Sequence, residues 1–140
     1  MSAGDARGVI RGLGYAGLIP FVVPAVLAAA APARADIAIN IAEAYALAII
    51  CFLCGSWWGA ARDSNSRAAL ILSNLYLLLS LGLFLFARQW WPLAAAVLLA
   101  GTWLCEQNGR MFPSNPPDYR RMRAILSLVS AASMALIHFS

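Results

Sequence analysis

Five long runs of apolar side chains, separated by short polar stretches, dominate this sequence. A helix that crosses the hydrocarbon core of a bilayer needs about 20 mostly apolar residues, and several of the runs reach that length. Only 11% of the 140 residues are charged, whereas a soluble domain carries about 25%. The sequence therefore predicts a single all-α integral membrane bundle. Its five transmembrane helices are expected at about 13–31, 39–61, 68–87, 90–108 and 122–139.

The arginines, which are the only basic residues apart from one histidine, predict the orientation of this bundle. If the N-terminus lies in the cytoplasm, the inner segments hold most of the arginines, as the positive-inside rule requires. Five spans then leave the C-terminus outside. The same distribution accounts for the net charge of +4 without a nucleic-acid partner. The inner arginines are Arg7, Arg11, Arg62, Arg67, Arg110, Arg120, Arg121 and Arg123, and the outer ones are Arg34 and Arg88.

The first span has a second interpretation. Arg7 and Arg11, an apolar core and Ala33-Arg34-Ala35 together resemble a secretory signal with its cleavage site. The span is long for such a signal, however, and it contains Pro20 and Pro24. These prolines, one turn apart, instead predict a kinked helix that stays in the mature protein.

Small and aromatic residues predict helix packing and depth in the membrane. Gly14, Gly17, Gly55 and Gly59 are expected to let helices approach closely. The letters of Gly12–Gly17 match a dinucleotide-binding motif, but that motif needs a preceding strand, which is missing. Aromatic and arginine side chains are typical of membrane–water boundaries. The expected interfacial anchors are Trp57, Trp58, Trp90, Trp91, Tyr119, Arg120, Arg121 and Arg123.

A polar layer is expected in the inner leaflet. Counting about 1.5 Å per residue along each helix places Ser56, Asn74, Thr102 and Glu106 at comparable depth, within reach of Arg62. The simpler interpretation is that these side chains form hydrogen bonds between helices. The alternative is a pocket for a lipid head group or a small polar ligand.

The sequence offers little for catalysis or for a metal ion. Cys51 and Cys54 form a C-x-x-C pair, but a structural zinc needs about four ligands, and His138 lies most of a bilayer away. Glu43 and Glu106 are single carboxylates without a positioned partner, which makes an acid–base enzyme the weakest hypothesis. We therefore expect a protein without catalytic activity, metal or cofactor.

Three stretches resemble a known family. They are Leu13–Phe21, the run from Tyr45 to Gly59 that ends Gly-Ser-Trp-Trp-Gly, and Pro117–Arg123. Their order and spacing are similar to those of an uncharacterised family (a domain of unknown function) of small five-helix bacterial inner-membrane proteins, which also includes a mitochondrial transmembrane protein. The resemblance implies an inner-membrane location and brings no established activity. The family pattern often has a histidine in the second helix, and Trp57 stands at that position.

Two functions remain open. The first is a non-catalytic accessory or assembly subunit that packs against a protein partner, or against further copies of itself, within the membrane. The second is a binder or carrier of a lipid, a quinone-like compound or another small molecule, which would use the polar layer. Membrane lipids are expected to contact the protein in either case.

Overall fold

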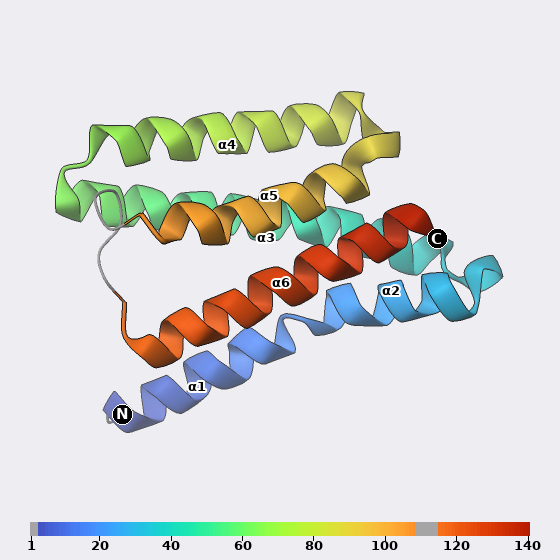
Figure 1. The fold of residues 1–140 in the computed structure, drawn as a ribbon, viewed down its shortest axis with the longest axis horizontal. Coiled ribbons are helices and arrows are strands. Elements are labelled where there is room, and N and C mark those ends of the chain that lie inside the picture. Colours follow the sequence, from blue (N-terminus) through green and yellow to red (C-terminus); the bar gives the residue numbers. More distant parts are fainter. Residues whose placement is uncertain (1–2, 109–114) are drawn as a thin grey trace.

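The computed structural model describes residues 3–108 and 115–140, and all regular structure in these ranges is helical (Figure 1). The all-α class expected from the sequence is therefore confirmed for the described residues. Four segments are long and apolar enough to span a membrane: Gly4–Ala30, Asp36–Ser64, Arg67–Phe86 and Pro117–Phe139. The helices are α1 (Ala3–Ala16), α2 (Ile19–Ala30), α3 (Asp36–Ser64), α4 (Arg67–Phe86), α5 (Trp91–Glu106) and α6 (Pro117–Phe139), with 3-10 turns η1 (Pro32–Arg34) and η2 (Arg88–Trp90).

The first apolar segment is broken between α1 and α2, and a proline explains where. Pro20 cannot donate a backbone hydrogen bond, and its ring collides with the carbonyl four residues earlier, which belongs to Ala16. The structure ends α1 at Ala16 and turns at Gly17 and Leu18 before α2 begins. The expected kink thus takes the form of a turn, while Pro24 lies inside α2.

The helices run back and forth along one direction (Figure 1). α4 lies at one edge, α3 and α5 lie beside it, and α6 lies between them and the α1–α2 pair. The start of α1, the α3–α4 turn and the start of α6 share one end of the bundle, and the C-terminus lies at the other. We call the first the arginine-rich end. It holds Arg7, Arg11, Arg62, Arg67, Arg120, Arg121 and Arg123, whereas Arg34 and Arg88 lie at the opposite end; Arg110 is outside the described residues.

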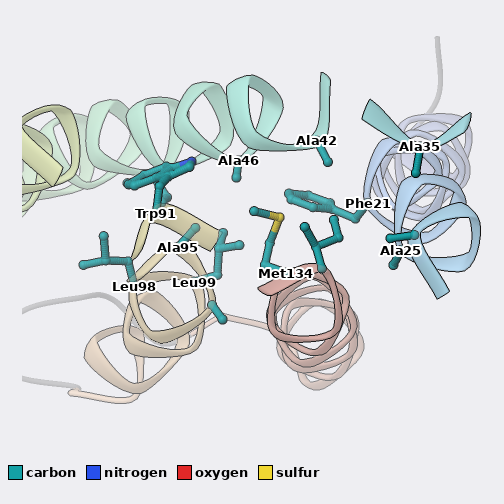
Figure 2. Packing of buried hydrophobic residues seen from close by; sticks show 14 of the residues in the cluster. Phe21, Ala25, Ala35, Ala42, Ala46, Trp91, Ala95, Leu98, Leu99 and Met134 are labelled. Carbon is teal, nitrogen blue, oxygen red and sulfur yellow. The ribbon is translucent and has the colours of Figure 1, made fainter. Parts of the chain in front are cut away.

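The core is built from a few large side chains that pack on small ones. Trp91 of α5 and Met134 of α6 are fully buried, and Phe21 of α2 is 2% exposed. They lie beneath Ala42 and Ala46 of α3, which are also fully buried (Figure 2). Lipid tails are as apolar as these side chains, so burial inside the bundle gains stability from close packing and not from leaving water.

Three serines lie on the buried side of α6. Ser127, Ser130 and Ser133 follow one another at intervals of three along α6 and are all buried. The hydroxyl of Ser130 donates to the carbonyl of Leu126 at 2.7 Å, and that of Ser133 donates to the carbonyl of Val129 at 2.8 Å. Each of these two hydroxyls is thus satisfied by its own helix, and the small side chains form a tight interface.

The glycines divide into two groups. A Cβ on Gly14 would lie 2.9 Å from the sulfur of Met122 on α6, and one on Gly17 would lie 3.4 Å from the hydroxyl of Tyr45 on α3. These two glycines lie where helices meet, as the sequence suggested. A Cβ on Gly55 or Gly59 would meet nothing within 4 Å, so this pair faces outward.

Gly101 of α5 lies in close contact with Tyr76 of α4, and the sequence analysis did not identify this contact. A Cβ there would lie 2.5 Å from the hydroxyl of Tyr76, which donates a hydrogen bond to the carbonyl of Leu98. Gly101→Ala is therefore expected to displace the tyrosine and to lower the free energy of unfolding by about 1–3 kcal/mol, despite the better helix propensity of alanine. Gly82→Ala, where a Cβ meets nothing within 4 Å, should be neutral or stabilising.

The double variant separates this clash from other effects. Adding Tyr76→Phe removes the hydroxyl that the new methyl meets, so the two changes together should cost less than the sum of the single changes. The free energy of unfolding is measured for the four proteins in detergent. Strict additivity would contradict the contact.

Candidate functional site

A buried ion pair closes the bundle near the arginine-rich end. Glu106, the last residue of α5, accepts two hydrogen bonds from Arg123 of α6: Nε donates to Oε2 at 3.0 Å, and Nη2 donates to Oε1 at 2.9 Å. The indole Nε1 of Trp57 on α3 donates to the same Oε1 at 3.0 Å. We call these three residues the Glu106 cluster; they join α3, α5 and α6.

The Glu106 cluster neutralises its own charge. Trp57 is 2% exposed and Arg123 is 9% exposed, so the pair is largely withdrawn from solvent. A fork-shaped contact between guanidinium and carboxylate, together with a further N–H donor, offsets the cost of placing both charges there. With both oxygens engaged by donors, this carboxylate is arranged to hold helices together.

A second polar cluster lies at the opposite end. Arg88 of η2 donates from Nε to Oε2 of Glu43 at 2.8 Å, and its Nη2 lies 2.7 Å from the same oxygen. Nη2 also donates to Oδ1 of Asn40 at 3.4 Å, and the guanidinium lies 4.2 Å from the ring centroid of Phe84. Trp91 donates to the main-chain carbonyl of Glu43 at 3.0 Å. This Glu43 cluster ties α3 to the start of α5.

The predicted polar layer is not one cluster, which corrects that expectation. Ser56 and Asn74 are exposed, and their side chains bond to carbonyls of their own helices, Leu53 at 2.8 Å and Leu70 at 2.9 Å. Arg62 is exposed as well. Thr102 is fully buried but donates to the carbonyl of Leu99. Of the five predicted residues, only Glu106 forms side-chain hydrogen bonds between helices in the described part of the chain.

The interfacial anchors also divide. Trp57 and Trp91 are buried and bonded inside the bundle, so their expected place at a membrane boundary is corrected. Arg123 likewise turns inward to Glu106. The remaining anchors have exposed side chains, as expected for the boundary: Trp58, Trp90, Tyr119, Arg120 and Arg121.

Next to the Glu106 cluster, a groove of about 400 Å³ opens on the side of the bundle. Its walls come mainly from α1, α2, α3 and α6, with Leu99 of α5, and Arg123 is among the lining residues. The turn at Gly17 and Leu18 lies along it, so the break in the first segment shapes this space. Sequence reasoning missed the groove because its walls are distant in sequence.

The described residues 3–108 and 115–140 hold no group of three or more His, Cys, Asp or Glu side chains arranged for a metal ion. The sequence-predicted pair Cys51 and Cys54 are free thiols in this part of the chain, as is Cys105. Two engaged carboxylates and this side groove are thus among the features of the described residues from which a function can be argued.

Comparison with known proteins gives one family match. No curated protein and no solved structure matches the chain significantly. A family model described as a protein of unknown function (DUF3429) matches residues 7–139. The match covers the broken first segment, both polar clusters and the last helix. The chain therefore belongs to the DUF3429 family of proteins of unknown function.

Proposed function

We propose that the protein is a non-catalytic accessory or assembly subunit, which packs the outer face of α3 and α4 against a transmembrane helix of another protein. The observation that carries this proposal is the position of Asn74. Its side chain is exposed near the middle of α4, and its Nδ2 donates only to the carbonyl of Leu70. In lipid, a polar side chain is expensive and is normally turned toward a partner.

The neighbouring surface suits a helix. Asn74 lines a shallow pocket of about 330 Å³ with Trp58 of α3 and Leu70 of α4. Gly55 and Gly59 lie one turn apart on the outward side of α3, with open space above them. Small residues at this spacing let a second helix approach closely, and an amide at the edge can add a hydrogen bond of about 1 kcal/mol.

The membrane topology is part of the proposal. We place the arginine-rich end in the cytoplasm of a bacterial cell, with five crossings of the inner membrane. α5 has 16 residues, hence a length of about 24 Å, and the three residues of η2 add about 6 Å. Together they match the hydrocarbon thickness of about 30 Å, which supports α5 as the fourth crossing.

Site-specific crosslinking tests the accessory role. A photoreactive amino acid replaces Asn74 or, as the control, Val97, an exposed residue of α5. The full chain is expressed in its own host and irradiated in intact membranes. We expect one protein to crosslink from position 74 and not from position 97. Gly59→Leu should reduce that crosslink at least tenfold, whereas Gly82→Leu, with the same added side chain on α4, should not.

Two results would contradict the proposal. Equal crosslinking from both positions would mean random encounters in the membrane. A crosslink between two copies of this chain would replace the accessory role by self-association. Circular dichroism and unfolding of each purified variant verify that Gly59→Leu has not simply destroyed the fold.

A further inference from the structure

The groove beside the Glu106 cluster has the dimensions of one lipid chain. Its wall on α1 and α2 runs from Ile10 to Phe21, and its wall on α6 runs from Tyr119 to Ser130. The wall on the continuous helix α6 covers eleven residue steps, which is about 16 Å at 1.5 Å per residue. Half of a hydrocarbon core of about 30 Å is about 15 Å. The groove therefore spans one leaflet, and its volume lies in the range of about 300–1,000 Å³ that is typical of ligand pockets.

The lining suits an acyl chain along most of this length. Leu13 of α1, Ile49 and Phe52 of α3 and Leu126 of α6 all face the space. Ser130 in the wall does not call for a polar ligand, because its hydroxyl donates to the carbonyl of Leu126 within its own helix. A flexible hydrocarbon chain fills such a surface by close packing.

Charge distinguishes the two ends of the groove. Tyr119 lies in the wall at the arginine-rich end, and Arg123 follows one turn later. Arg7 precedes Ile10 by three residues on α1, and therefore extends the same helix face outward. The exposed arginines on these two helices are Arg7, Arg11, Arg120 and Arg121, against two exposed aspartates, Asp5 and Asp118. The mouth is thus positively charged.

The guanidinium of Arg123 provides N–H donors near the mouth of the groove. Its Nε and Nη2 bind Glu106, while Nη1 makes no hydrogen bond with the described residues. The Arg123 side chain also lines the groove. A phosphate oxygen near the mouth could accept from it, without disturbing the ion pair.

We propose that this groove binds one anionic phospholipid from the leaflet at the arginine-rich end. One acyl chain lies between α1–α2, α3 and α6, and the phosphate lies against Arg123 and the exposed arginines of the mouth. This site is separate from the outer face of α3 and α4, and its occupancy does not depend on a protein partner.

Native mass spectrometry tests the site with defined lipids. The purified full chain is exchanged into mixed micelles that contain phosphatidylglycerol and phosphatidylcholine with identical acyl chains. We expect one phosphatidylglycerol to remain bound per protein, at least fivefold in preference to phosphatidylcholine. Arg7→Gln combined with Arg120→Gln should reduce this preference toward one, because both side chains are exposed and contribute charge at the mouth.

Groove-filling variants test the place of binding. Leu13→Trp and Ile49→Trp add a ring from two different walls, and each should lower retention of the lipid at least fivefold. Val97→Trp, at an exposed position of α5 outside the groove, is the matched control and should retain it. Using two walls guards against one variant that fails to fold, and circular dichroism verifies each protein.

The proposal is overturned if both lipids are retained equally, since that result indicates boundary lipid only. It is also overturned if neither lipid is retained, or if Leu13→Trp and Ile49→Trp fold correctly and behave like Val97→Trp.

Discussion

Arg123→Met is expected to lower the free energy of unfolding by about 3–5 kcal/mol, because it leaves the carboxylate of Glu106 charged and without its main partner. Arg123 supplies two of the three donors to this carboxylate, and both side chains are largely buried, at 10% and 18% exposure. Unfolding is followed by circular dichroism as SDS is added to protein in mild detergent, with the wild type measured in parallel.

The opposite end supplies a matched control. Arg88 pairs with Glu43 at a similar distance, but the Arg88 side chain is 46% exposed. Its partner Glu43 is only 11% exposed, so the carboxylate left behind still carries a penalty, and Arg88→Met should cost about 1–3 kcal/mol. The cost should stay below that of Arg123→Met because solvent and head groups reach the place of the exposed arginine. Equal costs for the two arginines would mean that burial of the arginine itself has no energetic consequence.

A rescue experiment distinguishes charge from packing. Combining Arg123→Met with Glu106→Gln removes both charges and keeps side chains of similar volume. The double variant should recover much of the lost stability, because replacing a buried pair by neutral side chains is often nearly neutral. If the double variant is as unstable as Arg123→Met alone, the unpaired charge of Glu106 is not what destabilises Arg123→Met.

The helices were predictable because lipid imposes a simple rule. Every backbone group in a bilayer must be bonded within its own segment, so each long apolar run has to form a helix. The helix ends were less predictable. α1 begins at Ala3, well before the first span expected from about residue 13, and α3 continues to Ser64, past the end expected at about residue 61. Polar residues at helix ends reach water and do not mark where a helix stops.

The depth of the candidate site residues along their helices was predictable from the sequence. The direction in which each side chain points was not. Rise along a helix places Glu106, Asn74 and Ser56 at one level, yet neighbouring residues differ by about 100° in the direction that they face. Glu106 faces inward and Asn74 faces outward, and composition does not distinguish them. Trp57 was expected at the boundary because its indole suits that place. The indole equally suits a buried position when its N–H finds an acceptor, and Glu106 supplies one.

The serines of α6 carried a signal in the sequence. Ser127, Ser130 and Ser133 share a spacing of three, which is typical of a small-residue helix face. The groove had no comparable signal in the sequence, because α1, α3 and α6 form it together and only the fold brings these helices side by side.

We expect alkaline phosphatase fused after Ser140 to be active in a bacterial host. Green fluorescent protein fused at the same place should not fluoresce. Alkaline phosphatase needs disulfides, which form in the periplasm and not in the cytoplasm. Five crossings from a cytoplasmic N-terminus place Ser140 outside. A fusion after Asn65, in the turn between α3 and α4, should give the opposite pair of signals, and one after Gln89 should resemble Ser140. The expected contrast is at least tenfold at each position.

The position of α5 decides this prediction. It is the shortest of the late helices, yet Trp91, Ala95, Leu99 and Thr102 are buried along most of its length, between α3 and α6. In the proposed topology, a helix held in the core by its neighbours crosses with them, even though it is shorter than an isolated span. A fluorescent fusion after Ser140, together with an active phosphatase after Gln89, would mean that α5 and α6 do not both cross. That result would exclude the five-span topology, but it would not contradict the packing of the other helices.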